Sequence, residues 1–247
     1  MARVDIEVCV NTEDSQPVHE IVHSAYIGGT ATIELCRALH LGGLTPARQH
    51  IVEARTAFPD RPGLMVMVRP RGGDFAYSQR EVEIMLRQIT IAAECRADGV
   101  VFGVLRPDDQ RVATSVVQRL IAESAARGLR TTFHRAFDAT PDPFEALDIL
   151  IRLGVDRVLT SGIPWGHPGT ALDGVDRLAN VIRYANGQIE VVIGGGVNGA
   201  NIAAILAKVP LDVSKVALHA YSGAQQAGKT TVQSVQAFVG AVNSASP

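Results

Sequence analysis

Residues 4–10 alternate between two kinds of side chain. The even positions are aliphatic and share one face, whereas Asp5, Glu7 and Cys9 share the other, which is typical of a β-strand with two different faces. Short apolar runs recur along the whole chain, and a segment suited to a helix follows each of them. The predicted strands are residues 4–10, 30–36, 64–70, 99–105, 130–138, 157–162, 190–193 and 215–219.

Start and stop signals bound the helices between these strands. Ser78 and Glu81 have the spacing of a capping box, and Thr45 precedes Pro46 as an N-cap precedes a first-turn proline. Gly154 is a helix stop. The predicted helices are residues 15–27, one starting at 45, 78–95, 112–127, 142–153, 171–186, one after 198, and 230–243.

The order of these elements predicts the fold. Eight strand–helix units of about 30 residues each, joined without a linker, are typical of a (β/α)8 barrel. We therefore predict an α/β protein with one TIM-barrel domain of parallel strands over residues 1–247. A doubly wound open sheet is the alternative. Such a sheet usually has fewer strands and a glycine fingerprint after the first, and residues 11–15 contain no glycine.

Composition narrows the classes of partner and compartment. The net charge is -2, with no long run of one sign, which gives no support for a nucleic-acid or anionic-membrane partner. No signal peptide or membrane-length apolar segment is visible, and there are only three cysteines, an odd and low number. That number favours a reducing compartment over a disulfide framework, so we expect a cytoplasmic protein.

Polar residues gather where the predicted strands end. In a TIM barrel the chemistry is carried by strand C-termini and the loops that follow them, so this placement predicts a polar pocket at the C-terminal mouth. The residues concerned are Glu7, Cys9, Glu34, Cys36, Arg69, Arg71, Asp74, His134, Arg135, Asp138, Ser161, Gly194, Gly195, Gly196 and His219.

An anion site is one interpretation of this mouth. Arg69, Arg71 and Arg135, with Ser161, would supply positive charge and donors, and the loop Gly194–Gly196 before a helix would supply free backbone N–H groups. The alternatives are a surface loop in which Arg71 pairs with a neighbouring aspartate, and a tight turn at the glycines.

Acid–base groups are a second interpretation. His134 and His219 are candidates because histidine ordinarily titrates near neutral pH, and Glu7, Glu34 and Asp138 are carboxylates at the same end of the barrel. The alternatives are hydrogen-bonded structural histidines and a buried ion network. In that network the two glutamates would balance arginines at strand ends, Arg69 and Arg135.

The thiols of Cys9 and Cys36 lie on neighbouring predicted strands, which are about 4.8 Å apart in a sheet. Thiolates are soft ligands that favour Cu(I) or Zn(II), and Met67 would add a soft contact from the third strand. The nearby arginines would favour the thiolate form. The alternative, which spacing alone favours, is that both cysteines fill the barrel interior as small apolar residues.

Six stretches of the chain carry a family pattern. They are Glu7-Val8-Cys9, Ile33-Glu34-Leu35-Cys36, Gly42-Gly43-Leu44-Thr45-Pro46, Arg69-Pro70-Arg71-Gly72-Gly73-Asp74-Phe75, Thr132-Phe133-His134-Arg135-Ala136-Phe137-Asp138 and Arg157-Val158-Leu159-Thr160-Ser161-Gly162.

These stretches resemble the CutC family of copper homeostasis proteins, in the order found in that family. The resemblance implies a (β/α)8 barrel, a cytoplasmic location and a role in copper handling, with Cu(I) bound at Cys9 and Cys36. Ala76 stands where some members carry a third cysteine, and residues 223–230 are short where relatives carry a longer excursion.

Two classes of function follow from the sequence. The first is copper binding or trafficking without catalysis, with a copper ion as the ligand. The second is a TIM-barrel enzyme that acts on a small phosphorylated or carboxylated anion at the C-terminal mouth. Whether the chain is an enzyme, and whether it forms a homo-oligomer, are left open.

Overall fold

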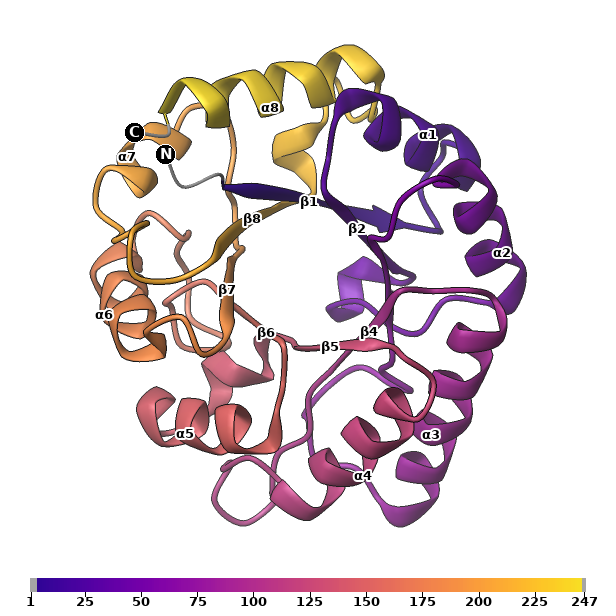
Figure 1. Cartoon of the computed structure of the whole chain (residues 1–247), viewed down its shortest axis with the longest axis vertical. Helices are drawn as coiled ribbons and strands as arrows, with labels where there is room; N and C mark the ends of the chain where they lie inside the picture. The colour runs from indigo at the N-terminus through magenta and orange to yellow at the C-terminus, as the bar shows by residue number, and fades with distance from the viewer. Residues whose placement is uncertain (1–3, 246–247) are drawn as a thin grey trace.

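The computed structural model describes residues 4–245, which form a closed barrel of eight parallel strands surrounded by helices (Figure 1). Each strand pairs with the next in sequence, and β1 pairs with β8 to close the barrel. The predicted TIM barrel is confirmed. The strands are β1 (Asp5–Asn11), β2 (Thr32–Cys36), β3 (Leu64–Met67), β4 (Gly99–Phe102), β5 (Arg130–Phe133), β6 (Arg157–Thr160), β7 (Glu190–Ile193) and β8 (Val216–Ala220).

The helices form the outer ring. Ser78 and Glu81 make the predicted capping box at the start of α3. No helix among residues 4–245 has the length and apolarity that crossing a bilayer requires. The helices are α1 (Val18–Gly28), α2 (Arg48–Ala57), α3 (Gln79–Glu94), α4 (Thr114–Ala125), α5 (Pro143–Leu153), α6 (Val175–Ala185), α7 (Ile202–Leu206) and α8 (Val232–Ala245).

Several strands end earlier than predicted. The fifth was expected to run to residue 138, but β5 stops at Phe133 and a 3-10 helix, η2 (Arg135–Ala139), follows. The cause is local, because Nδ1 of His134 accepts a hydrogen bond from the backbone N–H of Ala136 and turns the chain. Two further 3-10 helices, η1 (Leu39–Leu41) and η3 (Ser222–Ala224), follow β2 and β8.

The helix start at Thr45 was predicted wrongly, because α2 begins at Arg48. The hydroxyl of Thr45 donates to Gln88 and accepts a hydrogen bond from the backbone N–H of Arg69. Thr45 therefore joins two loops at the mouth of the barrel and does not cap a helix.

The apolar residues form one large outer layer and two small inner clusters. The outer layer packs the outward faces of the strands against the helices, as the even-numbered aliphatic residues of β1 illustrate. Inside the barrel, a sulfur-rich cluster lies beside β1–β4 and a smaller one beside β6–β8. The inner clusters consist of Cys9, Cys36, Met65, Met67 and Val101, and of Leu159, Val192 and Ala217.

Gly103, just after β4, gives a test of packing at the mouth. A Cβ there would lie 2.5 Å from two ring atoms of His134 and 2.7 Å from the side chain of Ala136. Gly103→Ala should therefore lower the free energy of unfolding by about 1–3 kcal/mol, measured by denaturant titration.

The matched control is Gly240→Ala in α8, where no atom lies within 4 Å of the added Cβ. This exposed helical position should gain up to about 1 kcal/mol. A Gly103→Ala protein as stable as the wild type would contradict the close packing around His134.

Candidate functional site

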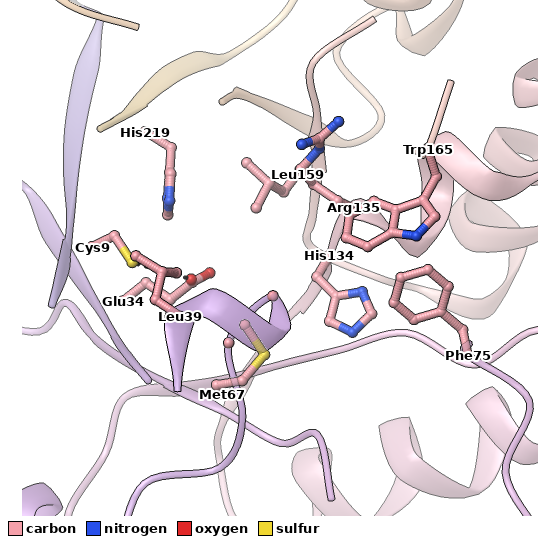
Figure 2. A pocket seen from close by; sticks show the side chains of 12 residues that line it. Cys9, Glu34, Leu39, Met67, Phe75, His134, Arg135, Leu159, Trp165 and His219 are labelled. Carbon is pink, nitrogen blue, oxygen red and sulfur yellow. Dashed lines mark hydrogen bonds between the residues drawn. The ribbon is translucent and has the colours of Figure 1, made fainter. Parts of the chain in front are cut away.

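A cavity of about 170 Å³ opens at the C-terminal mouth of the barrel (Figure 2). This volume is smaller than that of most small-molecule sites in proteins, about 300–1,000 Å³, and suits an ion or a ligand of few atoms. Polar groups and large apolar side chains share its wall, which suits a small ligand with polar and apolar parts. The cavity is lined by Cys9, Glu34, Leu39, Gly42, Gly43, Met67, Phe75, His134, Arg135, Leu159, Trp165 and His219.

The two predicted thiols meet, although not at the same level of the barrel. The register of β1 and β2 sets Cys9 opposite Glu34 and Cys36 opposite Asn11, so the cysteines are diagonal neighbours. Their sulfur atoms are nevertheless 3.8 Å apart, and both residues are buried. With metal–sulfur bonds of about 2.3 Å, this separation corresponds to a sulfur–metal–sulfur angle of about 110°.

Met67 lies in the same inner cluster, as the sequence suggested for a soft contact. A Cβ placed on Gly43 would lie 3.5 Å from the terminal methyl of Met67 and 3.6 Å from the sulfur of Cys36. The thioether and the second thiol therefore border the same glycine, whose missing side chain leaves room beside them.

A buried ion network occupies the barrel interior, but its arginine is Arg157. The Glu7 carboxylate accepts hydrogen bonds from Arg157 at 2.6 Å and from Thr32 at 2.8 Å, and it contacts Nδ1 of His219 at 2.9 Å. Glu7 and Arg157 are each 1% exposed. The expectation that Arg69 and Arg135 balance the glutamates is therefore wrong.

The network fixes the charge of Glu7 and influences His219. Burial alone would raise the pKa of Glu7, but Arg157 and His219 outweigh it and hold this pKa well below its usual range. Burial would lower the pKa of His219, but the Glu34 charge and the hydrogen bond to Glu7 outweigh burial and raise it. Glu7 is thus an ionised partner that orients the His219 ring.

Glu34 has no such arginine. Its Oε1 lies 3.9 Å from the sulfur of Cys9, and its Oε2 is buried without a hydrogen-bond partner. Burial raises the pKa of Glu34 to about 7, so this carboxyl group titrates at neutral pH.

The prediction that arginines favour the Cys9 thiolate is wrong. The hydrogen bond to Cys36 and burial, followed by the charges of Cys36, Glu34 and Glu7, raise the pKa of the Cys9 thiol. Because the nearest charges are negative, metal binding at Cys9 has to displace a proton.

His134 is buried beneath the mouth and contacts the ring of Phe75. Burial, and then the charge of Arg69, lower the pKa of His134 to about 3, so the ring is neutral at physiological pH. Since Nδ1 accepts a hydrogen bond from Ala136, the neutral ring carries its proton on Nε2, which has no partner. The buried Nε2–H of His134 is therefore a hydrogen-bond donor without a partner among the described residues.

The arginines of the loop after β3 are occupied by the protein itself. Arg69 is 1% exposed and donates to the backbone carbonyls of Leu41, Gly43 and Gly73. Arg71 bonds to Asp74 and Glu81. Arg69 thus joins the loops of the mouth, and the structure does not bring either arginine to the cavity wall.

Arg135, Ser161 and Asp138 do come together. Arg135 donates to Asp138 at 2.8 Å and to the hydroxyl of Ser161 at 2.7 Å. Asp138 also accepts hydrogen bonds from Thr160 and from the backbone of Ser161. With its oxygens used in this way, Asp138 positions Arg135 at the rim.

A second cavity, of about 270 Å³, adjoins the first and includes the glycine loop. Gly194–Gly196, Arg135 and His219 all line it. The helix expected after residue 198 is α7, which begins at Ile202 and has five residues. The glycines therefore border the cavity without a helix dipole directly behind them.

Arg157 and Trp165 are among the residues of the site that the sequence did not predict. Arg157 begins a buried strand, and a charged residue at such a position was a signal for an interior partner. Trp165 stands in the loop 163–169, where its ring lies 5.3 Å from the guanidinium carbon of Arg135 and packs against Phe75. A single tryptophan within a Pro/Gly-rich loop was the available signal.

Comparison with known proteins gives one consistent family. The CutC family model matches residues 4–218. A CutC family protein of Parabacteroides distasonis is 39% identical over 203 residues, covering 82% of this chain and 78% of that protein. The copper homeostasis protein cutC homolog of Mus musculus is 41% identical over 206 residues, covering 81% and 68%. The crystal structure of the protein named CutC from Streptococcus agalactiae superposes with a TM-score of 0.76 at 30% identity, covering 88% of this chain and 98% of that one.

The unpaired carboxyl group of Glu34 predicts a pH-dependent stability. Because folding raises its pKa from about 4.5 to about 7, the carboxyl group ionises in the unfolded chain first, and the folded protein loses stability as pH rises through this window. The free energy of unfolding of metal-free Glu34→Gln should therefore exceed that of the wild type by a margin that grows from pH 4.5 to 7. Above this window it should reach the order of 3 kcal/mol.

The control is Glu20→Gln, which changes an exposed carboxylate in α1. Its stability difference from the wild type should stay nearly constant between pH 5 and 8. Denaturant titrations at several pH values measure both differences, and a Glu34→Gln margin that does not grow with pH would contradict the burial of an unpaired carboxyl group.

Proposed function

The chain belongs to the CutC family, and from this premise we propose that it acts in copper homeostasis by binding Cu(I) at Cys9 and Cys36. The observation that carries the proposal is the 3.8 Å separation of two buried sulfur atoms. Thiolates are the ligands that Cu(I) prefers, and the bent angle of about 110° leaves room for a third soft ligand. Met67 is the thioether beside them.

The mouth cavity supplies an entry path for the ion. Cys9 lines this cavity, whereas Cys36 does not belong to its lining, so an arriving ion meets Cys9 first. Both thiols lose their protons on binding, which makes the affinity fall as pH decreases. Free thiols and Cu(I) both require a reducing environment, and we therefore propose the cytoplasm as the location.

Anaerobic Cu(I) titration against a competing chelator tests the proposal. Cys9→Ser and Cys36→Ser should each weaken binding at least about tenfold, because each removes one metal–sulfur bond. The control is Cys95→Ser, at the end of α3, which should bind Cu(I) as the wild type does. Undiminished binding by both Cys9→Ser and Cys36→Ser would rule out this site.

A second candidate function is an enzyme acting on a small phosphorylated or carboxylated anion. One observation favours it, namely that Arg135 and the loop Gly194–Gly196 line a common cavity next to His219. In this proposal Arg135 and Ser161 hold the anion, and Glu34, with a pKa of about 7, is the group that can exchange a proton at neutral pH. Arg69 and Arg71 contribute by shaping the loops.

Titration with inorganic phosphate and with malonate, followed by NMR, tests the anion site. Arg135→Gln should weaken binding of at least one anion about tenfold, since it removes the charged donor of the cavity. Arg106→Gln alters an exposed arginine that pairs with aspartates in its own loop, and it should have no effect. Equal anion binding by wild type and Arg135→Gln would argue against this function.

A further inference from the structure

Cys9 belongs to a second group of potential metal ligands that does not include Cys36. One ligand atom each of Cys9, Glu34 and His219 lie within 4.8 Å of one another. The three residues come from adjacent strands, because β1 pairs with β2 on one side and with β8 on the other. Figure 2 shows their side chains gathered on one wall of the mouth cavity.

The orientation of His219 suits a ligand. Its Nδ1 contacts the Glu7 carboxylate at 2.9 Å, and this leaves Nε2 for an exogenous partner. Metal-bound histidines almost always make such a hydrogen bond with their other ring nitrogen, which fixes the tautomer and the direction of the ring. Glu7 is itself held by Arg157 at 2.6 Å, so the support for the ring is rigid.

Glu34 provides an independent indication that a cation can bind here. The residue is only 3% exposed, yet its Oε2 has no hydrogen-bond partner. A buried polar atom without a partner costs about 1–3 kcal/mol, more if the group is charged. A cation next to this oxygen would remove that cost, and Glu34 lines the cavity from which a cation would arrive.

We propose that Cys9, Glu34 and His219 bind a divalent ion of the zinc class, with a fourth coordination position open to the mouth cavity. Thiolate sulfur, carboxylate oxygen and imidazole nitrogen are the three ligand types of protein zinc sites. Three protein ligands with one open position are the pattern of zinc sites that bind water or a substrate. This mixed set is harder than a thiol pair and therefore disfavours Cu(I).

The one measured ligand pair is close to the spacing of a four-coordinate ion. For metal–sulfur and metal–oxygen bonds of about 2.3 and 2.1 Å, tetrahedral geometry separates the two ligand atoms by about 3.6 Å. The sulfur of Cys9 and Oε1 of Glu34 are 3.9 Å apart, so a shift of a few tenths of an ångström brings this pair to that separation. A ring nitrogen of His219 lies within 4.8 Å of the ligand atoms of the other two residues. Across the cavity in Figure 2 lie Arg135 and His134.

Titration of the metal-free full-length protein with Co²⁺, a spectroscopic substitute for zinc, tests the site under anaerobic conditions. The wild type should bind one equivalent, with a thiolate-to-cobalt charge-transfer band and the intense visible bands of a four-coordinate ion. Cys36→Ala should keep both features, whereas Cys9→Ala should lose the charge-transfer band. Displacement of Co²⁺ by Zn²⁺ should then rank the Zn²⁺ affinities of the wild type, Cys36→Ala and Cys9→Ala in the same order.

Two further variants separate this site from the Cu(I) site. Glu34→Gln and His219→Asn should weaken Zn²⁺ binding about 10- to 100-fold and leave Cu(I) binding within about threefold of the wild type. Cys36→Ala should weaken Cu(I) binding and leave Zn²⁺ binding within about threefold of the wild type. Far-ultraviolet circular dichroism and thermal unfolding confirm that each variant is folded, and Glu34→Gln keeps the shape of the side chain.

Two results would overturn the proposal. One is Zn²⁺ affinity unchanged in both Glu34→Gln and His219→Asn. The other is loss of the cobalt spectrum in Cys36→Ala to the same extent as in Cys9→Ala, which would place the ion between the two thiols. Neither result depends on whether Cu(I) binds, because both are measured with Zn²⁺ or Co²⁺ alone.

Discussion

Closing a sheet of eight strands shields the side chains deep in its interior from water. A charged side chain there needs a partner of opposite charge, and Glu7 and Arg157 form such a pair. Both side chains are 1% exposed, so each charge has to be compensated inside the protein. Arg157, Thr32 and His219 together surround the Glu7 carboxylate. The orientation of His219, and with it the polar half of the mouth, follows from this one buried charge.

Two glutamates and two cysteines that look equivalent in the sequence have different surroundings inside the barrel. Glu7 and Glu34 each precede a cysteine by two residues on adjacent strands, yet one is ionised by Arg157 and the other is left without an arginine. The cysteines differ as well, because Cys9 lines the cavity and Cys36 lies behind it. Cys9 thus belongs both to the thiol pair with Cys36 and to the group that it forms with Glu34 and His219.

The sequence predicted the barrel and most of its strands because hydrophobic periodicity is a local property. It did not predict where strands end, because this depends on side chains such as His134, which turns the chain after the last hydrogen bond between β5 and its neighbour. The cysteines were placed on the correct strands, but their diagonal register depends on backbone pairing. Arg157 was overlooked because its partner, Glu7, is 150 residues away in the sequence.

The neutral interior has a consequence for which ions it accepts. Glu7 and Arg157 cancel each other, and the thiols and Glu34 are uncharged while they keep their protons. A divalent ion with one thiolate and one carboxylate preserves this neutrality. A monovalent ion with two thiolates leaves one negative charge, which His219 can offset by gaining a proton. The number of protons exchanged with solvent during loading is therefore a signature of which ligands an ion has found.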